Sequence, residues 1–178
     1  PVNSAGEIDF EMFRSLITDR TKILALVHVS NAIGTINSVK EMIAEARKVG
    51  ALCVVDGAQA GPHLSIDVQD LDADFYTLSC HKMYAPTGIG ILYGKIKHLE
   101  SMPPYQGGGS MIEQVEIDSS TYAKPPAKFE PGTPNIVGFI GYGASLDFLA
   151  SLGGGEKNWT RKQWVGAMDR IANHEHDL

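Results

Sequence analysis

Six polar side chains stand at or just beyond the ends of three short apolar segments, residues 22–29, 51–55 and 75–79. They are Asn31, Asp56, Gln59, Ser79, His81 and Lys82. If the apolar segments are strands of an open α/β sheet, these side chains meet at its carboxyl edge, where such sheets bind ligands. A carboxylate, two amides, a hydroxyl, an imidazole and an amine at one edge indicate a site more strongly than any of them alone.

This set of groups suits the chemistry of pyridoxal phosphate (PLP). Lys82 supplies an amine that can form a Schiff base with an aldehyde, and Asp56 supplies a carboxylate that can keep a pyridine nitrogen protonated. Hydroxyl, amide and imidazole groups can hold the phosphate or the ring oxygen. Simpler interpretations stay open: Lys82 as a surface lysine in a turn, Asp56 as a helix N-cap, and His81 as a structural histidine.

The elements that must position these residues begin with a strand–helix–strand unit. Residues 22–29 (KILALVHV) form a nearly continuous apolar run, which predicts a strand buried on both faces. Ser38 followed by Glu41 predicts a capping box at the start of a helix, and Gly50 stands where a C′ glycine belongs. Residues 51–55 (ALCVV) predict a second strand. This order predicts two parallel strands joined by a right-handed crossover.

The rest of the sequence continues the α/β pattern. Apolar spacing predicts helices over residues 8–17, 134–152 and 159–178 and strands over residues 75–79 and 88–93. Prolines and glycines predict a loop over residues 99–110 and an irregular, exposed segment over residues 115–130. Gly153-Gly154-Gly155 is expected to end the preceding helix. The last helix shows no ending signal, which favours a piece of a longer chain.

The composition is that of a globular protein. Of the 178 residues, 43% are hydrophobic and 20% are charged, and no apolar run approaches the ~20 residues that span a bilayer. The net charge of −6 and a pI near 5.4, without a cluster of basic residues, argue against nucleic acid or a membrane as partner.

The cysteines and histidines outside the strand ends have simpler expected roles. Cys53 and Cys80 are too few for a disulfide framework, which favours the cytoplasm or another reducing compartment. Cys53 is expected to be a small core residue and His28 a hydrogen-bonded core histidine. His174 and His176 would face different directions on a helix, so no metal site is predicted.

Five segments in the same order resemble one known family. They are HVSNAIGT (28–35), VVDGAQA (54–60), DFYTLSCHKMYAPTGIGILYGK (74–95), GGGSMI (107–112) and FEPGTPN (129–135). The chain resembles the cysteine desulfurases and selenocysteine lyases, most closely of the SUF type, within the class V aminotransferases of fold-type I. The resemblance implies the large PLP-binding domain: a mostly parallel sheet flanked by helices, incomplete at both ends.

The resemblance implies a role for each site residue. Lys82 would be the catalytic, Schiff-base lysine, Asp56 the partner of the pyridine nitrogen, and Gln59 a donor to the ring hydroxyl. Asn31 would contact the cofactor or substrate beside the ring, and Ser79 and His81 would bind the phosphate. Thr133, in GTPN, would reach the phosphate of the neighbouring subunit's cofactor, which implies a homodimer.

The implied reaction converts L-cysteine to L-alanine and passes the sulfur, as a persulfide, to an acceptor protein for iron–sulfur cluster assembly. The resemblance places the nucleophilic cysteine beyond residue 178, although Cys80 beside Lys82 is a second candidate. Residues 1–153 would be the central part of the large domain and residues 154–178 the start of a truncated C-terminal segment. The stretch at 153–164 matches no pattern of the family.

Two other readings of function stay open. One is a selenocysteine lyase or a class V aminotransferase, which would share the lysine and the carboxylate. The other is a non-catalytic scaffold fragment that keeps the fold without the chemistry.

Overall fold

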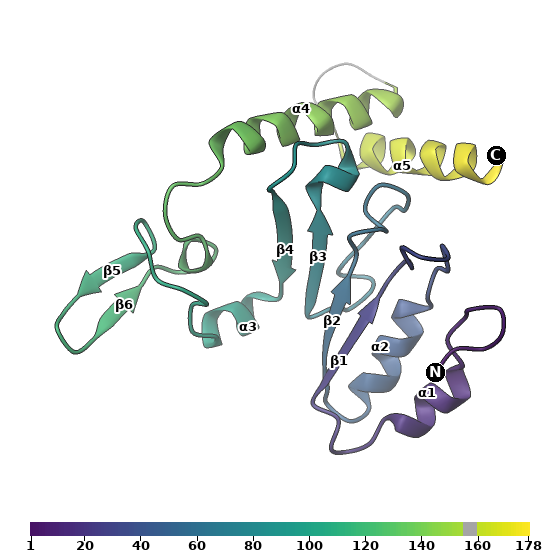
Figure 1. Ribbon diagram of the computed structural model, residues 1–178, viewed down its shortest axis with the longest axis horizontal. Coiled ribbons are helices and arrows are strands. Elements are labelled where there is room, and N and C mark those ends of the chain that lie inside the picture. Colours follow the sequence, from purple (N-terminus) through teal and green to yellow (C-terminus); the bar gives the residue numbers. More distant parts are fainter. Residues whose placement is uncertain (155–159) are drawn as a thin grey trace.

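The computed structural model describes residues 1–154 and 160–178, which form an α/β arrangement (Figure 1). The helices are α1 (Phe10–Leu16), α2 (Val39–Arg47), α3 (Ile96–Ser101), α4 (Ile136–Leu152) and α5 (Arg161–His176), with short 3₁₀ helices η1 (Cys80–Met83) and η2 (Ala127–Phe129). The strands are β1 (Ile23–Val27), β2 (Leu52–Asp56), β3 (Phe75–Ser79), β4 (Gly90–Gly94), β5 (Ile112–Val115) and β6 (Ser120–Tyr122).

A four-stranded sheet in the order β1-β2-β3-β4 carries the fold. Strands β1, β2 and β3 are parallel, and β4 runs antiparallel to β3. The predicted parallel strand–helix–strand unit and the mostly parallel sheet are therefore confirmed. In register, Val27 lies beside Asp56 and Asp56 lies beside Thr77, so β1 and β2 end level and β3 runs two residues further, to Ser79.

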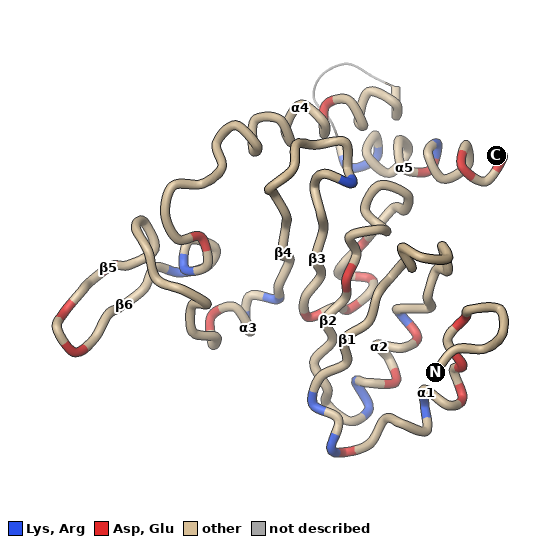
Figure 2. The backbone as a smooth tube through the Cα atoms, in the orientation of Figure 1, with Lys and Arg blue, Asp and Glu red and all other residues tan. Residues whose placement is uncertain are grey.

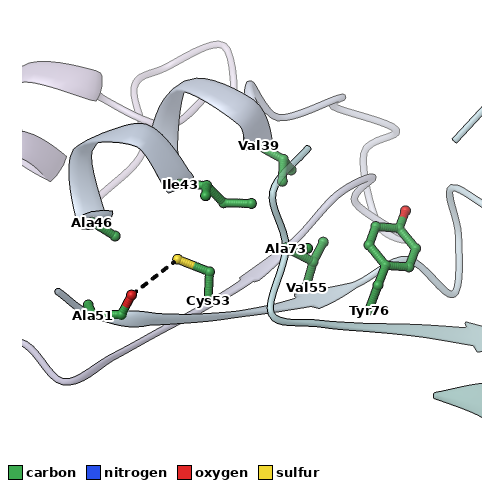
Figure 3. Packing of buried hydrophobic residues seen from close by; sticks show 8 residues of the cluster. All are labelled: Val39, Ile43, Ala46, Ala51, Cys53, Val55, Ala73 and Tyr76. Atoms are coloured by element: carbon green, nitrogen blue, oxygen red, sulfur yellow. Dashed lines mark hydrogen bonds between the residues drawn. The ribbon is translucent and has the colours of Figure 1, made fainter. Parts of the chain in front are cut away.

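The hydrophobic core lies between α2 and one face of this sheet. Figure 3 shows Val39, Ile43 and Ala46 of α2 facing Cys53 and Val55 of β2. Cys53 is fully buried, as expected for a small core residue. This packing fixes β2 in the middle of the parallel strands.

The prediction that the first strand is buried on both faces is wrong. In β1 exposed and half-buried residues alternate, and Ile23 is 62% exposed. Leu24 and Leu26 pack against the core cluster under α2. Because side chains alternate across a strand, Ile23 and Val27 point to the opposite face, away from that helix.

The predicted end of α2 is confirmed, but its predicted N-terminal capping box is not. Gly50 has a φ of +74°, its N–H donates to Arg47 O, and Ala51 N–H donates to Ala46 O, so Gly50 is the C′ residue of a Schellman motif. The capping box at Ser38 does not form, because Ser38 has a ψ of 63° and its side chain makes no capping hydrogen bond. A capping box forms instead between Thr160 and Gln163 at the start of α5.

The segments after β4 differ in detail from the sequence predictions. Helix α3 occupies the first residues of the expected loop, and a β5–β6 hairpin forms where an irregular segment was predicted. Figure 2 shows acidic residues at the tip of this hairpin. The helices predicted over 134–152 and 159–178 are present as α4 and α5, while Gly155 and Trp159 lie outside the described residues. No helix in the described ranges is long and apolar enough to cross a membrane.

A buried ionic cluster ties the amino ends of β2 and β3 to two helices. The Asp74 side chain is 1% exposed and accepts hydrogen bonds from Arg47 Nη1 at 2.6 Å and from Cys53 N at 2.8 Å. His98 Nε2 of α3 lies 3.0 Å from its other oxygen, and Lys95 Nζ lies 3.4 Å away. Burial alone would raise the pKa of Asp74, but Arg47 and the Cys53 amide outweigh it and lower that pKa to about 2.

Candidate active site

The polar residues singled out in the sequence do gather at the carboxyl edge of the parallel strands. Asp56 is the last residue of β2 and Ser79 the last of β3, while Asn31 follows β1. Lys82 lies in η1, which begins directly after β3. The parallel pairing of the three strands therefore brings to one edge residues that are up to 51 positions apart in the chain.

Lys82 and Gln59 make the central contact of this site. Lys82 Nζ donates a hydrogen bond of 3.1 Å to Gln59 Oε1, and both side chains are partly buried. Gln59 lies in the turn after β2, and the 3₁₀ helix η1 places Lys82 on the neighbouring strand end. The amine is thus held by a neutral acceptor rather than by a carboxylate.

Asp56 lies at the strand end with an exposed side chain. Its Oδ1 accepts a hydrogen bond of 2.9 Å from Ala58 N, two residues on, which is the pattern of an Asx turn rather than of a helix N-cap. The next residue, Gly57, lies directly against Tyr76, since a Cβ at Gly57 would come within 1.9 Å of the Tyr76 ring. Only glycine lets the chain turn away here without displacing that ring.

Tyr76 and His28 form a hydrogen-bonded pair beneath the strand ends. Tyr76 Oη and His28 Nδ1 are 2.8 Å apart, and the two rings meet edge to face. Burial, with a smaller contribution from Asp56, raises the pKa of Tyr76, and burial lowers the pKa of His28. Both shifts disfavour the charged forms of this pair. His28 is hydrogen-bonded, as expected, but it is half-buried rather than a core residue.

Ser79 and His81 form a second polar pair. Ser79 Oγ lies 3.0 Å from His81 Nδ1, and His81 is exposed. A hydroxyl and an imidazole beside each other at a strand end can both donate to an anionic group. Thr133 lies elsewhere, exposed on the loop between η2 and α4.

A cavity of about 340 Å³ is lined by two of the predicted site residues, Asn31 and Gln59. His63 and Glu175 line it as well. Neither of these two was predicted from the sequence. His63 could have been noticed because it follows Gln59 by four residues, whereas Glu175 is 112 residues from His63 and carries no signal that places it here.

Cys80, between Ser79 and His81, does not resemble a reactive thiol. It is completely buried, and burial raises the pKa of its thiol. Because the thiolate is the nucleophilic form, such a thiol reacts poorly. The structure favours the interpretation of Cys80 as a core residue.

The sheet and its polar edge define the class: the chain has the α/β fold of the fold-type I PLP enzymes. Residues 1–173 match the family described as aminotransferase class V. The chain therefore belongs to the class V aminotransferase family. The resemblance drawn from the sequence motifs is confirmed at this level.

Similar proteins are named cysteine desulfurases. A probable cysteine desulfurase of Halalkalibacterium halodurans is 48% identical over all of this chain and 40% of its own length. A cysteine desulfurase of Dickeya dadantii is 48% identical over 86% of this chain and 37% of its own length. The chain thus spans about two fifths of the length of these relatives.

Solved structures show the same likeness. The cysteine desulfurase CsdA of Escherichia coli has a TM-score of 0.81 and 46% identity, over 84% of this chain and 38% of that one. A cysteine desulfurase of Thermococcus onnurineus NA1 has a TM-score of 0.86 and 34% identity, over 99% of this chain and 41% of that one.

Proposed function

We propose that this chain forms the central part of the large domain of a PLP-dependent cysteine desulfurase. The enzyme would convert L-cysteine to L-alanine and transfer the sulfur to an enzyme cysteine as a persulfide. The observation that carries the proposal is the Lys82–Gln59 hydrogen bond at the strand edge that also bears Asp56. Relatives named cysteine desulfurases support the choice of substrate.

The donor set at the strand ends fits PLP. Lys82 would form the Schiff base with the aldehyde carbon, and Asp56 would pair with the ring nitrogen. Gln59 would form a hydrogen bond with the ring hydroxyl. Ser79 and His81, already paired at 3.0 Å, would hold the phosphate, and Asn31 would contact the ring from the side. When bound, PLP supplies an electron sink that stabilises negative charge at the substrate Cα.

The chain's own residues would then carry out specific steps. Lys82, whose amine is held at the strand edge by Gln59, would remove the proton from the substrate Cα. Asp56 would keep the ring nitrogen protonated. The nucleophilic thiolate would come from a cysteine outside these residues, because Cys80 is buried and burial raises the pKa of its thiol.

Several wider statements belong to the same proposal. Residues 1–153 would be the central part of the large domain, and residues 154–178 would begin the C-terminal segment. The full-length protein would act as a homodimer in the cytoplasm, with Thr133 reaching the phosphate bound by the neighbouring subunit. A sulfur-acceptor protein would take the persulfide sulfur for iron–sulfur cluster assembly.

Adding PLP to the full-length protein and recording its visible absorbance tests the cofactor site. The wild type should turn yellow as the Schiff base forms, and Lys82→Ala should abolish the band and lower sulfide and alanine release by at least about 10²-fold. Lys40→Ala is the matched control, because Lys40 pairs with Asp70 on the surface. Folded wild-type protein without the band would favour a scaffold.

Product analysis separates the related activities. Equal release of sulfide and alanine from L-cysteine is expected when an added thiol reductant reduces the persulfide and is itself oxidised to a disulfide. Transamination of pyruvate without sulfide would contradict the desulfurase assignment and favour an aminotransferase. A strong preference for selenocysteine over cysteine would favour a selenocysteine lyase.

A further inference from the structure

We propose that His63 and Glu175 are positioning residues that orient the side-chain amide of Gln59 so that its carbonyl oxygen faces Lys82. This inference rests on the proposed function, in which Lys82 and Gln59 hold PLP. Neither His63 nor Glu175 needs to touch the cofactor to act in this way.

A continuous series of polar contacts connects the four side chains. Glu175 Oε1 and Oε2 lie 2.8 and 3.0 Å from His63 Nδ1. On the other side of the imidazole, His63 Nε2 lies 3.4 Å from Gln59 Nε2. Gln59 Oε1 then accepts the 3.1 Å hydrogen bond from Lys82 Nζ.

The donor and acceptor roles in this series determine one another. A carboxylate can only accept, so Nδ1 of His63 must carry the proton that faces Glu175. In the neutral imidazole, Nε2 is then an acceptor, and it receives an N–H from the Gln59 amide. The amide must therefore turn its NH₂ toward His63, which leaves its oxygen for the Lys82 amine.

Without Glu175, this preference would be lost. The His63 ring could carry its proton on Nε2, which would then donate toward Gln59 and attract the amide oxygen. The rotated amide would present its NH₂ to the Lys82 amine, donor against donor. Gln59 would no longer hold either Lys82 or the ring hydroxyl in a single orientation.

Helix α5 delivers Glu175 to this position. Figure 1 shows α5 beside α4, and Glu175 lies in the last turn of α5. At the other end of the helix, Arg161 pairs with Asp67. Arg170 Nη1 donates to Leu152 O of α4 at 2.8 Å. The helix is thus held along its length, and the Glu175–His63 pair is its contact with the candidate active site.

The exposure of the pair sets the size of the effect. The side chains of His63 and Glu175 are 36% and 38% exposed, so water can replace part of their hydrogen bonding. A partly exposed positioning contact is worth about one neutral hydrogen bond, which corresponds to a change of about three- to tenfold in affinity.

Absorbance titration of the full-length protein with PLP tests the inference. Glu175→Ala and His63→Phe should each weaken PLP binding by about three- to tenfold, and the double variant should be no weaker than either one. Glu175→Gln should bind within about twofold of wild type, because its amide oxygen still accepts from Nδ1. Arg161→Gln is the matched control: it removes one exposed contact at the end of α5 away from Glu175, while the Arg170 hydrogen bond to Leu152 still holds the helix, so the affinity should be unchanged.

A measurement without PLP checks the hydrogen-bond roles directly. Nitrogen NMR of His63 should show the proton on Nδ1 in the wild type and in Glu175→Gln, and a loss of that preference in Glu175→Ala. The positioning role would be overturned if Glu175→Ala kept the His63 tautomer or the PLP affinity of the wild type. It would also be overturned if Arg161→Gln lost as much PLP affinity as Glu175→Ala. Either result would leave the proposed function intact. A wild type that forms no Schiff-base band would overturn both.

Discussion

Replacing Asp74 by asparagine removes one charge from the cluster that joins the amino ends of β2 and β3 to α2 and α3. The side chain keeps its shape, so packing changes little. The hydrogen bonds from Arg47 and Cys53 lose their ionic acceptor, while Arg47 keeps its contact with Asp72 at 2.8 Å. The free energy of unfolding should therefore fall mainly through the lost charge.

The pKa of Asp74 gives the size and the pH dependence of this loss. Its value of about 2 in the folded chain, against 3.8 as the ordinary value, corresponds to about 2 kcal/mol. Below pH 3.8 the unfolded chain binds a proton that the folded chain still excludes, so the stability from Asp74 falls as the pH falls. It is complete above about pH 5, and about half remains at pH 3.

Denaturant unfolding of the wild type and Asp74→Asn at pH 7, 5 and 3 measures the effect. The difference in unfolding free energy should be about 2 kcal/mol at pH 7 and 5 and about 1 kcal/mol at pH 3. Asp70→Asn is the control, since Asp70 and Lys40 are 62% and 61% exposed and such pairs contribute about 0–1 kcal/mol. A difference that stays constant down to pH 3, or one no larger than the control's, would refute the reasoning.

Two further changes test the support beneath the strand ends. Gly57→Ala should lower the unfolding free energy by about 1–3 kcal/mol in urea titration, because the new Cβ would meet the Tyr76 ring at 1.9 Å; an unchanged stability would show that the ring can move aside. Tyr76→Phe should cost about 1 kcal/mol by removing the hydrogen bond to His28. Burial lowers the pKa of His28, so its contribution to the unfolding free energy is complete above about pH 6.5 and declines as the pH falls. An unfolding free energy that rose on acidification in the wild type but not in His28→Phe would contradict this pH dependence.

The sequence predicted the positions of Asp56 and Ser79 at the strand ends because those positions follow from one local rule. Asp56 and Ser79 each end an apolar run, and a run that ends in polar residues is visible without knowing the fold. Parallel pairing then brings those ends to one edge. Lys82 could be assigned to the same edge because it follows Ser79 by three residues, and a short turn after a strand keeps it near the strand end.

The errors come from information that is not local. Ser38 and Glu41 have the right residue types for a capping box, but the backbone at Ser38 follows the connection from β1 and does not aim the hydroxyl at the helix. One face of β1 is exposed because α2 packs only on the other face. A continuous apolar run does not reveal whether one or both faces of a strand will be covered. Glu175 reaches His63 through the packing of α5, over 112 residues.

The parallel strands carry a buried, paired carboxylate at their amino ends and an exposed carboxylate at their carboxyl ends. At the amino ends, Asp74 is buried, and its oxygens are held by cations and a backbone amide. A ligand could reach it only by breaking that cluster, so Asp74 can stabilise the fold but cannot bind. At the carboxyl ends, Asp56 is exposed and accepts from the Ala58 amide. The strands thus present at their carboxyl ends a carboxylate that can take a cationic partner at little cost to the fold, as the proposed pairing with a pyridinium nitrogen would require.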